Sequence, residues 1–269
     1  MSADKPLLLV GCGKMGGALL DGWLAGGIVT ADRVLVVEPA DVPLPAGVRR
    51  VADAGALATE LAPGVVVLAV KPQAMDAVLP PYARFVAPDT VFLSIAAGKP
   101  IGYFAGHLGS DAAIVRAMPN TPAAVGRGVT VLCANARVGE TQRAICAALL
   151  SAVGAVDWVD DEALMDAVTA VSGSGPAYVF LLAEALAEAG VAAGLPADLA
   201  GKLARLTVAG SGELLMQSDL PAATLRQNVT SPGGTTAAAL AVLMADDGLA
   251  PLLTRAVDTA TRRSRELAG

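Results

Sequence analysis

The sequence predicts an α/β protein whose first part is a Rossmann-like, doubly wound parallel sheet and whose second part is all-helical. Three observations support this class: a glycine fingerprint directly after an apolar run, strand patterns that alternate with helices, and the loss of strand patterns beyond residue 162. The acidic stretch Asp160–Glu162 is a charged break and a good helix start. We therefore expect two domains, at residues 1–161 and 162–269.

The fingerprint begins after Leu7–Val10, a continuous apolar run typical of a strand buried on both faces. The next six residues read G-x-G-x-x-G and lead into a helical pattern through Trp23; they are Gly11, Cys12, Gly13, Lys14, Met15 and Gly16. Such glycines permit a tight turn, close approach of a pyrophosphate, and close packing of the helix on the strand. The flanking strand and helix predict a dinucleotide-binding loop.

An acid follows the second expected strand, residues 33–37. Glu38 lies 22 residues beyond Gly16, where a carboxylate accepts a hydrogen bond from the adenosine ribose and repels a 2′-phosphate. The nearest arginines, Arg49 and Arg50, lie well downstream in the sequence. We expect a modest preference for NADH over NADPH, with a plain surface acid as the alternative.

Further strands are expected at residues 65–70, 90–94, 114–118 and 129–132, with helices around 75–79 and 101–108. In a parallel sheet the carboxyl ends of the strands share one edge, where ligands bind. The residues at that edge are Lys71, Pro72, Ala96, Ala97 and Asn120. Small residues suit a nicotinamide lying flat, and Asn120 can bond its carboxamide or ribose. Each residue alone is ordinary turn chemistry, but together they favour a cofactor site.

The second half contains a helical stretch, residues 178–193, that is apolar almost all round, with Glu184 and Glu188 as its only charges. A helix of this kind must be buried in a core or against another subunit. A half of this size is too small to bury several such helices within itself. We therefore expect a homodimer formed through the helical domain.

A loop of hydroxyl, proline and glycine residues, Thr230–Thr236, precedes an alanine-rich helix. A helix start directs free backbone N–H groups and a positive dipole at one point, so it can hold a small anion, most simply a carboxylate. The candidate substrate contacts are Ser231, Gly233, Gly234, Thr235 and Thr236. The alternative is an ordinary helix cap, with Thr235 or Ser231 as the capping residue.

Composition excludes several classes of partner. A net charge of −6 argues against nucleic acid and anionic membranes. The three cysteines form no C-x-x-C pair, so we expect neither a disulfide framework nor a metal site, and a reducing cytoplasm fits. The start of the chain lacks a signal-peptide layout, and the uncharged run at 227–245 contains proline and paired glycines. A soluble cytoplasmic protein is expected.

Acid–base residues are few. His107 is the only histidine and falls in an expected surface helix. Reduction of a ketone normally needs a lysine or histidine acid, whereas hydride transfer to a protonated C=N bond does not. The sequence therefore favours imine reduction. Two alternatives stay open: a hydroxyacid dehydrogenase of the same plan using Lys202, and a non-catalytic dinucleotide-sensing protein.

Five segments, in this order along almost the whole chain, resemble those of the pyrroline-5-carboxylate reductase family: Gly11–Gly16, Ala69–Pro72, Met118–Pro122, Ser172–Tyr178 and Asn228–Thr236. The resemblance implies NAD(P)H-dependent reduction of 1-pyrroline-5-carboxylate to L-proline, the last step of proline biosynthesis. It also implies a dimer interlocked through the helical domain, often assembled further into a decamer.

The same resemblance assigns roles to residues. Gly11–Gly16 would hold the pyrophosphate, with Ala69, Val70, Lys71, Pro72, Ala96, Ala97 and Asn120 at the cofactor cleft. Gly233, Gly234 and Thr235 would present N–H groups to the substrate carboxylate, and Thr236 would place its hydroxyl beside the ring nitrogen as the catalytic candidate. Family members usually carry an asparagine near the position of Ala56, contacting the adenosine ribose. Its absence here leaves the cofactor preference open.

Overall fold

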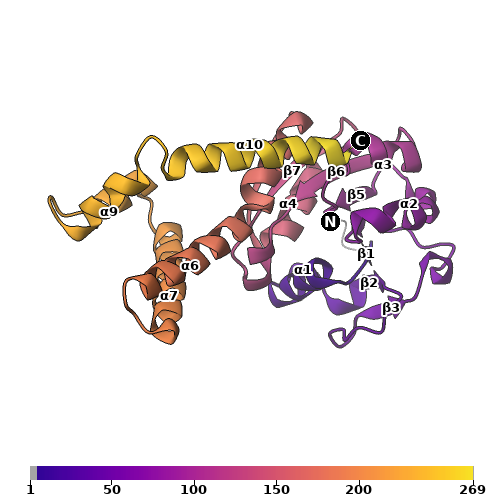
Figure 1. The fold of residues 1–269 in the computed structure, drawn as a ribbon. Helices are drawn as coiled ribbons and strands as arrows, with labels where there is room; N and C mark the ends of the chain where they lie inside the picture. The colour runs from indigo at the N-terminus through magenta and orange to yellow at the C-terminus, as the bar shows by residue number, and fades with distance from the viewer. Residues whose placement is uncertain (1–4, 269) are drawn as a thin grey trace. The chain divides into compact units, whose positions relative to one another are not determined.

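The computed structural model describes residues 5–268, which form two compact units (Figure 1). One unit runs to Gly173 and also takes in the end of the chain from Thr261 onward, and the other is Ser174–Ala260. The functional boundary expected at 161/162 stays a prediction, because compactness within one chain does not by itself assign a role to either side.

The first unit is built on one eight-stranded sheet in the order β3-β2-β1-β4-β5-β6-β7-β8. All neighbouring strands pair in parallel except β6 and β7. The strands are β1 (Leu7–Val10), β2 (Val34–Val37), β3 (Arg49–Val51), β4 (Val65–Leu68), β5 (Val91–Ser94), β6 (Ala113–Met118), β7 (Gly128–Ala134) and β8 (Gly154–Trp158). The expected Rossmann-like, doubly wound sheet is confirmed. Strand β3 was not anticipated, because its sequence, Arg-Arg-Val, has no apolar run.

The central strands are buried on both faces, as their continuous apolar sequences indicate. Along β1, Leu7 and Leu9 belong to one hydrophobic cluster, and Leu8 and Val10 belong to the cluster on the opposite face. Helix α1 (Lys14–Ala25) covers the first face through Trp23, which is 0% exposed. The indole N–H of Trp23 donates to the Leu149 carbonyl of α4 (Glu140–Ser151) at 2.7 Å. This packing fixes the glycine loop at the start of α1.

The other helices of this unit are short. The helix expected at 75–79 is a single turn, α2 (Met75–Val78), because Pro72 precedes it and Pro80 and Pro81 follow. The 3₁₀ segments η3 (Pro72–Ala74) and η4 (Pro80–Phe85) flank α2. The expected helix α3 (Ile101–Leu108) is confirmed.

The second unit is helical. Its helices are α6 (Gly175–Ala192), α7 (Ala197–Gln217), α8 (Ala222–Asn228), α9 (Thr235–Leu243) and the first part of α10 (Leu249–Ala268). Helices α6 and α7 pack together where Gly190 meets Ala200, which is 2% exposed. Large apolar side chains stay exposed in the single chain, among them Phe180 at 67% and Leu181 at 62%. The all-round apolar helix is therefore present and is not buried within this chain.

One helical stretch among the described residues, Glu162–Ala192, is long and apolar enough to cross a membrane by length and composition alone. Core helices of soluble proteins meet the same criterion, so the stretch is weak support for a membrane span.

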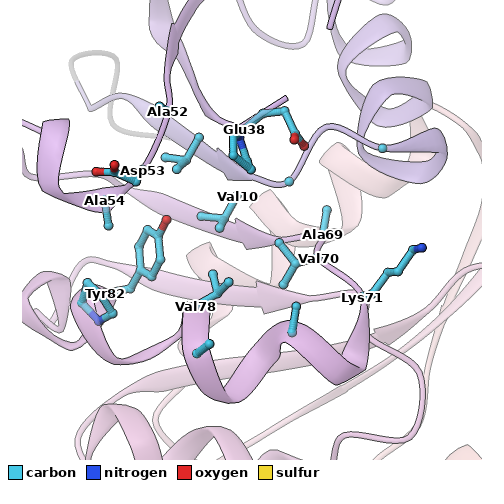
Figure 2. A pocket seen from close by; sticks show the side chains of 17 residues that line it. Val10, Glu38, Ala52, Asp53, Ala54, Ala69, Val70, Lys71, Val78 and Tyr82 are labelled. Atoms are coloured by element: carbon cyan, nitrogen blue, oxygen red, sulfur yellow. The ribbon is translucent and has the colours of Figure 1, made fainter. Parts of the chain in front are cut away.

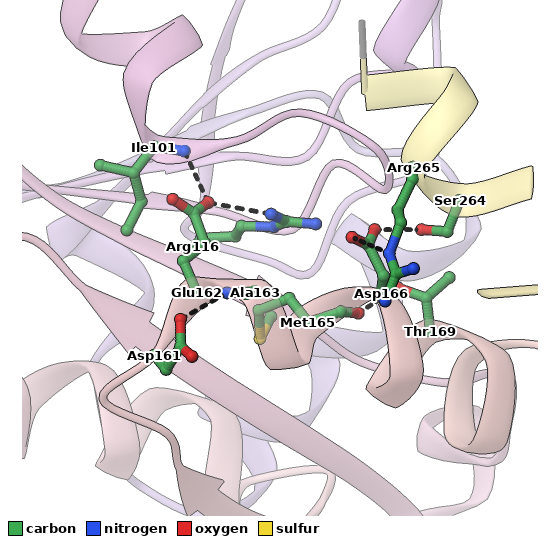
Figure 3. A network of polar contacts seen from close by, with 10 residues as sticks. All are labelled: Ile101, Arg116, Asp161, Glu162, Ala163, Met165, Asp166, Thr169, Ser264 and Arg265. Atoms are coloured by element: carbon green, nitrogen blue, oxygen red, sulfur yellow. Dashed lines mark hydrogen bonds and ion pairs between the residues drawn. The ribbon is translucent and has the colours of Figure 1, made fainter. Parts of the chain in front are cut away.

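A polar network joins the charged break to the sheet (Figure 3). Arg116 of β6 is 5% exposed, and its Nη1 lies 2.9 Å from Glu162 Oε1. The same oxygen accepts the N–H of Ile101, the first residue of α3, at 2.8 Å. Further along, Asp166 accepts a 2.6 Å hydrogen bond from the hydroxyl of Ser264 near the end of α10. These contacts explain why residues 162–173 and the end of α10 belong to the sheet unit.

Removal of either partner of the Arg116–Glu162 pair should destabilise the protein unequally. Glu162→Ala leaves a buried guanidinium without its carboxylate and should lower the free energy of unfolding by about 3 kcal/mol. Arg116→Met should lower it less, because the Glu162 side chain is 31% exposed and can be hydrated. Urea denaturation of both variants measures the difference. A larger loss for Arg116→Met than for Glu162→Ala would contradict this account.

Candidate active site

The glycine loop leaves room for a ligand at the start of α1. Gly11 has φ +91°, and a Cβ on it would lie 2.9 Å from the Ala69 carbonyl group. A Cβ on Gly13 would meet nothing within 4 Å, so open space lies directly over the loop. Gly13 is the N-cap residue of α1 and makes no side-chain cap, so the N–H groups of the first turn are available to an anion. The loop therefore fits a dinucleotide pyrophosphate.

Two cavities border this loop on the sheet unit. The first, of about 500 Å³, extends from Gly11 and Gly13 past Glu38 to Asp53 and Tyr82 (Figure 2). The second, of about 650 Å³, is lined by Gly13, Lys14, Met15, Ala69, Val70, Lys71, Pro72, Ile95, Ala96, Ala97, Met118 and Pro119. Gly13, Ala69, Val70 and Lys71 line both cavities. Most of the expected cofactor residues thus gather at one edge of the sheet, and their contacts with a cofactor stay predictions.

Three expected cofactor residues lie behind the cavity walls. The N–H of Cys12 donates to Glu38 Oε2 at 2.8 Å. The Cys12 side chain is buried, and burial together with the nearby Glu38 charge raises the pKa of its thiol. A Cβ on Gly16 would lie 2.3 Å from the Gly11 carbonyl oxygen, so Gly16 lets α1 pack against the loop. Cys12 and Gly16 therefore shape the loop from behind.

Asn120, the third of these residues, links two parts of the sheet unit. Its Nδ2 lies 3.3 Å from the Ser172 carbonyl oxygen, and its Oδ1 accepts the Val129 N–H at 3.0 Å. Ser172 belongs to a π-helical turn, Thr169–Gly173, and such a turn leaves backbone carbonyls for outside donors. The structure gives the Asn120 amide a positioning role, and its predicted cofactor contact remains untested.

Glu38 lies closer to an arginine than its place in the sequence suggests. Strand β3 pairs with β2 and aligns Arg50 with Val36. The Arg50 guanidinium donates to the backbone carbonyls of Glu38 at 3.1 Å and Ala40 at 2.8 Å, and it pairs with Asp41 at 3.1 Å. Arg49 and Arg50 lie well downstream in the sequence, but strand pairing brings Arg50 to the Glu38 backbone.

The loop before α9 is a tight turn. The Gly234 N–H donates to the Ser231 carbonyl at 3.0 Å, with Pro232 and Gly233 between them and φ +72° at Gly233. These are the features of a type II turn. Gly234 is the N-cap residue of α9 and no side chain caps the helix, so the alternative of a cap by Thr235 or Ser231 is not what the structure shows. The Gly234 N–H is therefore occupied, whereas the amides of Thr235 and Thr236 in the first turn of α9 have no hydrogen-bond partner among residues 5–268.

Sequence reasoning missed two polar residues of the first cavity, Asp53 and Tyr82. Neither belongs to a motif, and Tyr82 follows two prolines in η4. His107, in contrast, lies where expected on α3. Its Nδ1 lies 3.0 Å from the Tyr103 carbonyl and its Nε2 lies 3.6 Å from Asp76, both outside the two cavities.

The strand order changes direction at β1 and β4, and the glycine loop and both cavities lie at that point. In open α/β sheets this is where dinucleotides bind. Fold and site together define the class of protein, a Rossmann-like, dinucleotide-dependent oxidoreductase.

Comparison with known proteins identifies the family. Residues 162–267 match the family model described as pyrroline-5-carboxylate reductase dimerisation, and residues 7–98 match that of NADP oxidoreductases, coenzyme F420-dependent. The chain is 41% identical to the pyrroline-5-carboxylate reductase of Pseudomonas aeruginosa, over 97% of this chain and 96% of that protein. It is 41% identical to that of Mycobacterium leprae over 99% of this chain and 98% of that protein. The chain belongs to the pyrroline-5-carboxylate reductase family.

Solved structures agree. A pyrroline-5-carboxylate reductase from Coxiella burnetii superposes with a TM-score of 0.90 at 34% identity, covering 98% of this chain and 99% of that one. The Plasmodium falciparum pyrroline carboxylate reductase with NADP bound has a TM-score of 0.83 at 32% identity, with 99% of each chain covered.

Proposed function

We infer that this chain reduces 1-pyrroline-5-carboxylate to L-proline with NAD(P)H, the last step of proline biosynthesis. The observation that carries the conclusion is a dinucleotide cavity at the glycine loop, in a chain that matches these reductases along nearly its whole length. Family membership removes the support for a hydroxyacid dehydrogenase or a non-catalytic sensor. Oxidation of NADH or NADPH on addition of racemic pyrroline-5-carboxylate tests it, and no turnover with either cofactor would contradict it.

On the cofactor side, the proposal assigns the pyrophosphate to the backbone of Gly11–Gly16. The second cavity, bordered by Ala69–Pro72 and by Ala96 and Ala97, would hold the nicotinamide end. When bound, the reduced nicotinamide supplies the hydride. The small side chains of this wall leave a flat surface, and the chain's contribution there is orientation and exclusion of water.

On the substrate side, the turn Ser231–Gly234 would set the first amides of α9 toward the substrate carboxylate. The Gly234 N–H is bonded to the Ser231 carbonyl, so the amides of Gly233, Thr235 and Thr236 are left for the carboxylate, and Gly233 also gives the turn its shape. The Thr236 hydroxyl, which has no hydrogen-bond partner among residues 5–268, would lie beside the ring nitrogen and accept its N–H when the imine is protonated. The protonated imine carbon is already electrophilic, so orientation carries most of the catalysis.

A preference for NADH is the finer proposal. The Glu38 and Asp53 carboxylates both line the first cavity and would repel a 2′-phosphate. Arg50 works against this preference, but its guanidinium is already bonded to Asp41 and to two backbone carbonyls. An NADP-bound relative is known from Plasmodium falciparum. In this proposal the repulsion of a 2′-phosphate by Glu38 therefore exceeds its attraction to Arg50.

Glu38→Gln should shift the preference toward NADPH. Loss of one negative charge at the ribose should raise kcat/KM for NADPH by roughly 10-fold, since a nearby charge contributes about 1 kcal/mol or more. The value for NADH should fall slightly. Steady-state kinetics with both cofactors gives the ratio, and Glu60→Gln, which removes the same charge from an exposed position outside the cavity, is the control. An unchanged ratio in Glu38→Gln would remove Glu38 from cofactor selection.

The proposal further includes a soluble, cytoplasmic homodimer that associates through the helical unit. Support comes from the dimerisation description of residues 162–267 and from the exposed apolar side chains of α6 and α7. Further assembly into a decamer is the extension that the family resemblance suggests. The net charge of −6 supports a small-molecule substrate over nucleic-acid or membrane partners. Light scattering in solution measures the size of the assembly.

A further inference from the structure

One buried residue of the first cavity has a hydroxyl group without a hydrogen-bond partner in the described part of the chain. Tyr82 is 1% exposed, yet its hydroxyl has no hydrogen-bond partner within residues 5–268. In the same part of the chain, every side-chain polar atom sealed from solvent does have a partner. The hydroxyl must therefore face open space. Figure 2 shows it pointing into the cavity between Asp53 and Val10.

The Tyr82 hydroxyl is held in its neutral form. Burial and, after it, the charge of Asp53 raise the pKa of Tyr82 to about 12. At physiological pH the group therefore carries its proton and can donate a hydrogen bond into the cavity.

An acceptor lies beside this donor. Asp53 Oδ1 accepts the N–H groups of Gly55 at 2.8 Å and Ala56 at 3.2 Å, which fixes the side chain. Its Oδ2 makes no hydrogen bond within the part of the chain that the structure describes. Donor and acceptor thus stand together at the end of the cavity opposite Lys71 (Figure 2).

The walls between these polar groups and the glycine loop are apolar, with Val10, Val70 and Val78 lining the cavity. A ligand that fits must have a flat apolar body with an acceptor and a donor at its edge. Adenine has both, since its ring nitrogen N1 accepts and its 6-amino group donates.

We propose that Tyr82 is a specificity-determining residue for the adenine of the dinucleotide, acting with Asp53. The Tyr82 hydroxyl donates to the ring nitrogen, and the Asp53 carboxylate accepts from the 6-amino group. This assignment rests on the proposed function only in requiring that the cavity holds the adenosine end of a dinucleotide.

Equilibrium binding of NADH and of reduced nicotinamide hypoxanthine dinucleotide, measured without the imine, tests the assignment. The analogue has a carbonyl where adenine has its amino group and an N–H at N1, so both hydrogen bonds are lost. The wild type should bind NADH roughly 10-fold more tightly than the analogue, because two hydrogen bonds are replaced by unfavourable contacts.

Tyr82→Phe should weaken NADH binding roughly 3- to 10-fold, the effect of one buried hydrogen bond, and leave the analogue unchanged. Asp53→Asn should narrow the preference for NADH over the analogue by strengthening binding of the analogue, because the asparagine amide can donate to the analogue's carbonyl. The asparagine oxygen can still cap the turn. The control is Tyr103→Phe, which removes a hydroxyl that bonds Asp76 outside the cavity. It should leave both affinities unchanged.

Unchanged NADH affinity and preference in Tyr82→Phe would overturn the assignment. The two proposals fail separately. If the enzyme turns over pyrroline-5-carboxylate but its preference for NADH over the analogue does not depend on Tyr82, only the adenine assignment is overturned. If that preference depends on Tyr82 but there is no turnover, the adenine assignment is supported and only the proposed reaction is contradicted.

Discussion

Gly16→Ala should abolish measurable dinucleotide binding. The added Cβ would lie 2.3 Å from the Gly11 carbonyl oxygen and 3.3 Å from the Ala69 Cβ. The Gly11 backbone cannot move aside, because its N–H is bonded to the Val37 carbonyl at 2.8 Å and its Cα side already faces Ala69. The strain must therefore push α1 away from β1, and with it the amides that would hold the pyrophosphate.

The expected size is a loss of NADH affinity of at least about 100-fold, with a decrease of about 2 kcal/mol in the free energy of unfolding from overpacking. Fluorescence titration with NADH and urea denaturation measure the two quantities. The neighbouring substitution Gly17→Ala is the matched control, because a Cβ there meets nothing within 4 Å. It should bind NADH as the wild type does and be more stable by about 0.5 kcal/mol or slightly more, as for any helical glycine replaced by alanine. Normal NADH affinity in Gly16→Ala would contradict the geometry.

Features fixed by local sequence could be predicted. The strands β1, β2, β4 and β5 are continuous apolar runs, and a strand of that kind has to be buried on both faces. The glycine fingerprint is likewise local, since the strand, the turn and the helix start follow one another in the chain. The position of Ala69–Pro72 and Ala96–Ala97 beside the second cavity follows from the same rule, because each comes just after a parallel strand.

Features created by pairing between distant segments could not be predicted. Strand β3 forms because Arg49–Val51 pairs with β2, and this pairing is what brings Arg50 to Glu38. Asn120 looked like a free amide at the sheet edge, but its partner Ser172 lies 52 residues away. Tyr82 carries no motif, and only its position over the cavity makes its hydroxyl informative.

The loop before α9 shows the same division between local sequence and longer-range contacts. Its Pro-Gly-Gly sequence identifies a turn before a helix, and that turn is present. Which amides stay free depends on one hydrogen bond, from the Gly234 N–H to Ser231, that the residue types do not determine. In our proposal the expected set of Gly233, Gly234 and Thr235 therefore loses Gly234 and gains Thr236.

Thr236→Val should lower kcat by roughly 100-fold, because loss of the hydroxyl that orients the protonated ring nitrogen would misplace the reacting carbon, and a misplacement of about 1 Å can have an effect of this size. Thr236 is the second residue of α9, and its hydroxyl has no hydrogen-bond partner among residues 5–268, so the substitution breaks nothing in the fold. Valine keeps the branched shape and the backbone N–H, and removes only the group proposed to face the ring nitrogen. NADH affinity and the urea midpoint should therefore stay as in the wild type, because neither depends on the Thr236 hydroxyl.

Two further variants make the result specific to the hydroxyl of Thr236. Thr236→Ser restores a hydroxyl at the same place and should recover most of the activity. Thr230→Val makes the same change six residues earlier, where the hydroxyl already donates to the Arg226 carbonyl at 2.7 Å and so is not available to a substrate. It should leave kcat unchanged. Steady-state kinetics of the three variants with pyrroline-5-carboxylate decides the matter: an unaltered kcat in Thr236→Val, or an equal loss in Thr230→Val, would remove Thr236 from the mechanism and leave the loop as a binding element for the carboxylate.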